Sequence, residues 1–189
     1  PGWLDTNSSP GNVTAIAETD EAVFAGTSSP IDAVWKYNGD SWERLIDSPG
    51  SVRTLYYDSD GETLYAGTAD GVWSSDGEDW FPVAGAPGNV NVLAMDNGTL
   101  IAGTDGNGIW AWDGGGWTKM NGTIDKVYAI ASSGGTWYAA GRGGGGPGSP
   151  DGVFMLSGGT WTFISGSPNY AYHVFDSNGT LVAGTLNFG

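Results

Sequence analysis

Five side chains near the start of recurring apolar segments could bind a ligand. Each stands second in a segment that begins with an apolar residue, and the five are Thr14, Arg53, Asn91, Tyr128 and Tyr172. Aromatic faces stack on the C–H surfaces of sugars, and Arg and Asn side chains hydrogen-bond paired hydroxyls. This set suits a polyol such as a glycan. The alternative is that these residues line a channel that holds only water.

A glycine-rich loop supplies another candidate. The segment GRGGGGPGSPDG runs from Gly141 to Gly152 and carries Arg142, one of only six cationic side chains in the chain. Such an insertion is either a flexible cover over a binding face or a neutral expansion. We predict that Arg142 contributes to ligand binding.

One acidic turn has the spacing of a calcium loop. Asp58, Asp60 and Glu62 place oxygen donors at alternating positions, and Ca²⁺ takes oxygen ligands. The same residues also make an ordinary acidic hairpin, so calcium is the weaker reading. No other cofactor is predicted.

Catalytic sets are sparse in this sequence. His173 is the single histidine, so a Ser-His-Asp triad or a histidine metal site would have to use it. Its position in the middle of an apolar segment favours a structural role. Glycoside hydrolysis needs two carboxylates, and none of the five second positions is acidic. We therefore expect a protein without catalytic activity.

The elements that hold these residues recur along the chain. Tryptophans recur at Trp3, Trp42, Trp80, Trp117 and Trp161, and an Ala-Gly pair recurs at Ala25, Ala66, Ala102, Ala140 and Ala183. Both markers return about every 38 residues, which is the mark of a repeat protein.

Each repeat predicts four short strands. The segment from Gly50 to Pro87 shows them most clearly as VRTLYYD, ETLYAGT, GVWSS and DWFPVA. Asn97-Gly98, Asn178-Gly179 and Asp60-Gly61 predict two-residue hairpin turns between first and second strands. Alternation with a period of two puts the second and fourth residues of each first strand on one side. The fourth residues, which are Ile16, Leu55, Leu93, Ile130 and Val174, are predicted to be core.

A repeated unit of four antiparallel strands resembles the blade of a β-propeller. The turn from Ser74 to Trp80 also resembles a shortened Asp-box of sialidase-type repeats, and the fivefold repetition is similar to the tachylectin-type lectins. The resemblance implies an all-β, five-bladed propeller of four-stranded antiparallel blades. It also implies that the five second residues ring the mouth of a central channel, near the variable loops.

We predict one domain over residues 1–189. Its repeats are approximately 11–49, 50–87, 88–123, 124–168, and 169–189 together with 1–10. The N-terminal strand around Trp3 would complete the last blade and close the ring, which removes exposed sheet edges. The last blade is then expected to have three strands, or the chain to be trimmed at Gly189.

Charge narrows the range of partners. The net charge is −15, which argues against nucleic acid and anionic membranes, since both attract Lys and Arg. No apolar run is long enough to insert into a membrane. The sequence favours a carbohydrate-binding or adhesive module on an extracellular, cell or virion surface, with a glycan or surface protein as partner. The alternative is a structural part of a capsid or surface assembly with neighbouring subunits.

Overall fold

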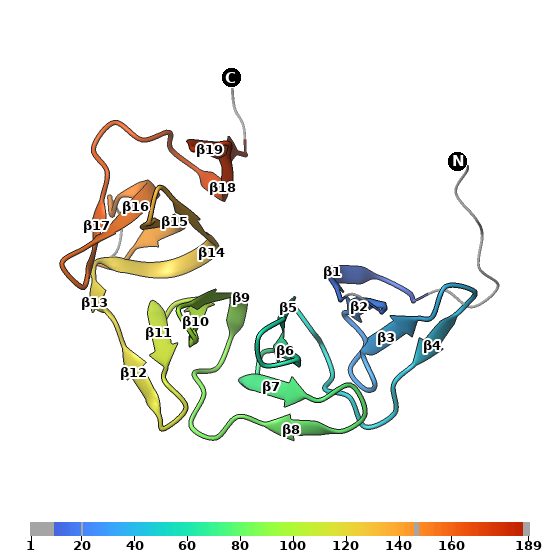
Figure 1. Ribbon diagram of the computed structural model, residues 1–189. Coiled ribbons are helices and arrows are strands. Elements are labelled where there is room, and N and C mark those ends of the chain that lie inside the picture. Colours follow the sequence, from blue (N-terminus) through green and yellow to red (C-terminus); the bar gives the residue numbers. More distant parts are fainter. Residues whose placement is uncertain (1–9, 20, 146–147, 187–189) are drawn as a thin grey trace. The chain divides into compact units, whose positions relative to one another are not determined.

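The computed structural model describes residues 10–19, 21–145 and 148–186 (Figure 1). The described residues form strands, turns and loops, and no helix among them could cross a membrane. The chain divides into two compact units, residues 1–88 and 89–189. The border falls between the second and third predicted repeats, and each unit is described by itself.

Unit 1 holds two four-stranded antiparallel sheets whose strand order follows the chain (Figure 1). We call each such sheet a blade. Blade one consists of β1 (Val13–Glu18), β2 (Val23–Thr27), β3 (Val34–Tyr37) and β4 (Trp42–Arg44). Blade two consists of β5 (Thr54–Asp58), β6 (Thr63–Gly67), β7 (Val72–Ser75) and β8 (Trp80–Pro82).

Unit 2 repeats the arrangement twice and begins it a third time. Blade three consists of β9 (Val90–Asp96), β10 (Thr99–Thr104), β11 (Ile109–Trp112) and β12 (Trp117–Lys119). Blade four consists of β14 (Ile124–Ser133), β15 (Thr136–Gly143), β16 (Asp151–Ser157) and β17 (Thr160–Phe163), with β13 (Asn121–Gly122) added in parallel to β17. A final hairpin pairs β18 (Ala171–Ser177) with β19 (Thr180–Thr185).

The closing strand lies outside the described residues. Trp3 belongs to the segment 1–9, so ring closure and the count of five blades stay predictions. The short strand β13 is an addition that the repeat pattern does not predict. It pairs Asn121 with Thr160 and Gly122 with Trp161.

Two of the three predicted hairpin turns are confirmed. Asn97-Gly98 and Asn178-Gly179 have positive φ at both residues, as a two-residue turn of this type requires. The prediction for Asp60-Gly61 is wrong. The last strand pair there is Asp58 with Thr63, which leaves a four-residue loop, and the positive φ falls on Glu62 at 49°.

The Ala-Gly pair exists because neighbouring blades approach each other at the glycine. A Cβ at Gly26 in β2 would lie 2.5 Å from Val52 Cγ1, at the start of blade two. A Cβ at Gly103 in β10 would lie 2.6 Å from Val127 Cγ1 in blade four. At these two junctions, a valine of the following blade therefore packs on the glycine of the preceding blade.

A buried threonine follows this glycine in three blades and closes the next loop. Thr27, Thr68 and Thr104 are each no more than 2% exposed. Their hydroxyls donate to the carbonyls of Ala33, Gly71 and Gly108, at 3.1, 3.1 and 2.8 Å. Blade four has Arg142 at this position, so its loop lacks that hydroxyl.

The turns between third and fourth strands share another device. The side-chain oxygens of Asn38, Asp76 and Asp113 each accept two backbone N–H groups, at 3.0 to 3.2 Å. These bonds hold the pKa of the Asp76 and Asp113 carboxyls below the ordinary value. The Asp-box-like turn of blade two is thus a self-supporting turn.

The prediction that fourth residues of first strands are core is correct at three positions. Leu55, Leu93 and Val174 are buried, and Ile130 is half-buried. Ile16 is 66% exposed, which contradicts it. Leu55 packs toward Gly26 of the blade before it, and blade one has no preceding blade within its own unit. Among the described residues of unit 1, Ile16 therefore has no surface like the one on which its counterpart Leu55 rests.

Candidate functional site

Four of the five candidate residues at second positions sit at β-bulges. Strand pairing shifts register between Val13 and Ala15, between Val90 and Val92, between Val127 and Ala129, and between Ala171 and His173. The residues at these shifts are Thr14, Asn91, Tyr128 and Tyr172. A bulge inserts one extra residue and re-aims its side chain.

The bulges correct one step of the sequence argument. Simple alternation does not run from the second to the fourth residue of a first strand, because the extra residue interrupts the count. The backbone at Arg53 behaves similarly. Its N–H donates to Gly67 O at 2.9 Å, and Gly67 also pairs with Thr54. The Arg53 side chain is half-buried and has a partner of its own.

Thr14 and Asn91 tie one blade to the next. The Thr14 hydroxyl lies 2.6 Å from Val52 O and 3.1 Å from Gly26 O. The Asn91 amide donates to Val127 O at 3.1 Å. The acceptors in the following blade, Val52 and Val127, each directly precede the second-position residue of that blade. These side chains therefore already serve the packing of blades within unit 1 and unit 2 respectively.

Tyr128 and Tyr172 come together across blade four and the final hairpin. Their rings stack with centroids 4.3 Å apart and planes at 21°. Lys126 Nζ lies 5.7 Å from the Tyr128 ring centroid, within cation–π range. Lys126 also forms an ion pair with Asp105 at 2.8 Å, and both side chains are partly exposed.

Arg142 lies directly opposite Lys126 in the sheet of blade four. It pairs with Lys126 of β14 on one side and with Asp151 of β16 on the other. Residues directly opposite in antiparallel strands point to one face. Arg142 is exposed, and within the described part of the chain no carboxylate comes within 4.0 Å of it.

We call this group the tyrosine site. It comprises Asp105, Lys126, Tyr128, Arg142, Asp151 and Tyr172. Tyr128, Tyr172 and Arg142 are predicted from the sequence, whereas Lys126, Asp105 and Asp151 are not. A signal was available for Lys126, since it is one of only six cations and stands two residues before Tyr128. Thr14 and Arg53 belong to unit 1.

The surroundings of Tyr128 raise the pKa of its phenol. Burial, a hydrogen bond to Tyr172 and the nearby charges of Asp151 and Asp105 raise its pKa from 10.0 to about 12. The raised value favours the neutral phenol in the folded state, so this contribution to stability is complete below pH 10.0 and is lost as the pH rises toward 12. Spectrophotometric titration should show that Tyr172→Phe lowers the Tyr128 pKa. An unchanged pKa of Tyr128 in this variant would refute the hydrogen bond.

The predicted calcium residues do not gather into a donor set. Asp58 Oδ1 accepts the Asp60 N–H at 3.2 Å, which supports the hairpin. In the part of the chain that the structure describes, no group of three or more His, Asp or Glu side chains could hold a metal ion. His173 is exposed in β18, and the backbone of Gly184 lies beside its Cβ.

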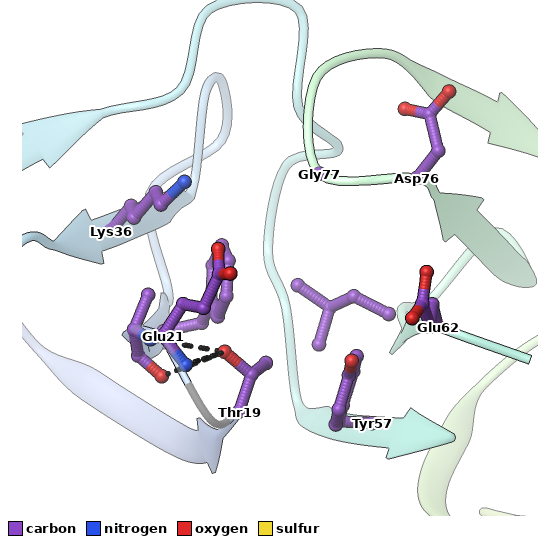
Figure 2. Close-up of a pocket in the computed structure, with 10 residues that line it drawn as sticks. Thr19, Glu21, Lys36, Tyr57, Glu62, Asp76 and Gly77 are labelled. Carbon is purple, nitrogen blue, oxygen red and sulfur yellow. Dashed lines mark hydrogen bonds between the residues drawn. The ribbon is translucent and has the colours of Figure 1, made fainter. Parts of the chain in front are cut away.

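A pocket that the sequence did not predict lies in unit 1 (Figure 2). It has a volume of about 260 Å³ and opens between blades one and two. Blade one contributes Lys36 and the β1–β2 loop with Glu21, while blade two contributes Tyr57, Glu62 and Asp76. These residues are far apart in sequence, which is why no motif revealed the pocket.

Solved structures share this fold, although no protein-family model and no curated protein matches the chain. The WD40 β-propeller domain of Doa1 matches with a TM-score of 0.67 and 18% identity, over 91% of this chain and 61% of its own. An ancestral GH74 enzyme gives a TM-score of 0.75 and 18% identity, over 97% of this chain and 30% of its own. The extracellular domain of a one component system from B. thetaiotaomicron gives 0.74 and 16%, over 97% and 27%.

The fold prediction is confirmed. The blades and these similarities make the chain an all-β propeller. Identities of 16 to 18% show the fold alone. The chain spans 61% or less of the length of each of these three structures.

Proposed function

We propose that this β-propeller is a non-catalytic module that binds carbohydrate at the tyrosine site. The observation that carries the proposal is the stack of Tyr128 on Tyr172, two bulge residues from successive first strands. Bulges commonly lie beside functional sites because they re-aim side chains. Two aromatic rings fixed in this way offer a rigid surface for the C–H face of a sugar.

The charges around the stack suit a neutral polyol. Lys126 and Arg142 supply donors, while Asp105 and Asp151 supply acceptors. Sugar hydroxyls both donate and accept hydrogen bonds, so a balanced set of donors and acceptors complements them. Asp151 Oδ1 is buried and has no partner within the described residues. A ligand hydroxyl that reaches this oxygen would satisfy it.

The proposal assigns no reaction to the site. Asp105 is held in an ion pair with Lys126 and serves the site as a hydrogen-bond acceptor. We place the protein on an extracellular, cell or virion surface, where glycans are available. The charge of −15 supports a solvated, non-aggregating surface protein.

A glycan array tests the proposal, with wild type and variants probed in the presence and absence of Ca²⁺. We expect Tyr172→Ala to weaken binding of the best glycan about tenfold or more, equivalent to ~1.4 kcal/mol. Phe175→Ala is the matched control, because Phe175 is an exposed aromatic residue on the same strand. Array-wide absence of binding, or equal losses in both variants, would contradict the proposal.

A structural role in an assembly is the second candidate. Among the described residues, eight large apolar side chains are exposed, and five of them lie in unit 1: Val13, Ile16, Ile31, Ile46 and Phe81. Contact with another protein would remove these apolar side chains from water. Native mass spectrometry separates the candidates, since the structural role predicts a stable assembly at low protein concentration and the binding module does not need one.

A further inference from the structure

The pocket between blades one and two has an apolar floor and a charged rim (Figure 2). Ala22, Phe24 and Leu64 line its base and are each no more than 8% exposed. The backbone N–H groups of Glu21 and Ala22 donate to the Thr19 hydroxyl at 3.3 and 3.0 Å, which holds these three residues together at one wall. The described lining therefore combines buried core residues with hydrogen-bonded polar ones.

Three residues with carboxylate side chains line the pocket, and they come from both blades. Glu21 comes from blade one, and Glu62 and Asp76 come from blade two (Figure 2). Two backbone N–H groups at 3.1 Å hold the pKa of Asp76 below its ordinary value, so this carboxylate stays ionised. With the single cation Lys36, the lining carries a net charge of −2 at neutral pH.

An ammonium group already occupies part of this pocket. Lys36 Nζ lies 5.8 Å from the centroid of the Phe24 ring, within the range in which a cation is attracted to an aromatic face. In the part of the chain that the structure describes, no carboxylate lies within 4.0 Å of Lys36 Nζ. The three carboxylates of the rim thus keep room for further cationic groups.

We propose that the pocket binds an alkyl diamine, a dication with two ammonium groups on a short carbon chain. Two positive charges would neutralise the remaining charge of the lining, with one ammonium near Glu21 and the other near Glu62 and Asp76. The carbon chain would lie on the floor of Ala22, Phe24 and Leu64. A volume of about 260 Å³ holds roughly eight water-sized groups, which suits the seven non-hydrogen atoms of 1,5-diaminopentane.

Calorimetry with three probes of one length tests the charge requirement. The probes are 1,5-diaminopentane, 1-aminopentane and 1,5-pentanediol. The diamine should bind at least fivefold more tightly than the monoamine, and the diol should not bind. Equal binding of monoamine and diamine, or no heat of binding from the diamine, would overturn the proposal.

Variants locate the binding. Asp76→Asn keeps the turn, since Asn38 makes the same two hydrogen bonds in blade one, and should weaken diamine binding at least fivefold. Asp113→Asn removes the same charge from the same turn position in blade three and should change nothing. Lys36→Met removes the internal ammonium and should strengthen binding about threefold or more.

Equal losses in Asp76→Asn and Asp113→Asn would show a response to net charge alone and would overturn the proposal. Weaker binding in Lys36→Met would overturn it as well. The result is independent of the carbohydrate proposal, because the two sites share no residue and lie in different units. Glycan binding can fail while diamine binding succeeds, and the reverse also holds.

Discussion

Gly103→Ala is expected to lower the free energy of unfolding by about 2–3 kcal/mol. The new Cβ would lie 2.6 Å from Val127 Cγ1 and 2.7 Å from Val92 Cγ1. Valine side chains are stiff at χ1, and Val127 is fully buried. The blades cannot yield at this point without disturbing the core of unit 2.

Chemical denaturation checks this prediction against Gly116→Ala. Gly116 lies in the turn between β11 and β12, and a Cβ there meets no atom within 4 Å. That control should change stability by less than about 0.5 kcal/mol. Similar effects of the two substitutions would contradict the close approach of blades at the Ala-Gly pair.

Phe154→Ala is expected to cost about 3–5 kcal/mol of stability, because it leaves a cavity in the core. Phe154 is fully buried in β16, and its ring meets Phe163 edge to face at a centroid distance of 5.4 Å. It packs in one cluster with Val127 and Trp161. Removal of the ring therefore leaves a cavity in a cluster that joins blade four to Ile101 and Ile109 of blade three.

Phe81→Ala serves as the control for this second substitution. Phe81 lies on the outer strand β8 and is 57% exposed, so its removal should change the free energy of unfolding by less than about 0.5 kcal/mol. A loss below 1 kcal/mol for Phe154→Ala, measured by the same denaturation, would show that this cluster is not a core.

The repeat pattern predicted the strands because each repeat satisfies the same local rules. Asn97-Gly98 requires a turn whatever surrounds it, and the recurring tryptophans mark fourth strands at Trp42, Trp80 and Trp117. Tertiary features were harder to predict. A bulge, such as the one at Tyr128, forms where two strands pair with a shift in register. The alternation of residues within one strand does not predict such a shift.

The residues of the tyrosine site were predicted only in part for the same physical reason. Tyr128 and Tyr172 were found because both stand second in a first strand, a position defined by the repeat. Lys126 and Asp105 were missed because their ion pair joins the start of the loop after β10 to the first strand of blade four. The pocket in unit 1 was missed for the same reason, since its walls come from two blades.

Arg142 shows how a departure from the repeat can be informative. Three other blades place a buried threonine after the Ala-Gly pair, whereas Arg142 at this position is exposed beside Lys126. An arginine cannot replace the loop-closing hydroxyl, because it has no acceptor.

Chemical-shift mapping with the best glycan from the array shows directly whether carbohydrate binds at the tyrosine site. If the tyrosine site binds carbohydrate, the largest backbone shifts should fall on Lys126, Tyr128, Arg142 and Tyr172, and they should disappear in Tyr172→Ala. Shifts that centre on the unit 1 pocket around Glu21 and Glu62, or that persist in Tyr172→Ala, would contradict carbohydrate binding at the tyrosine site.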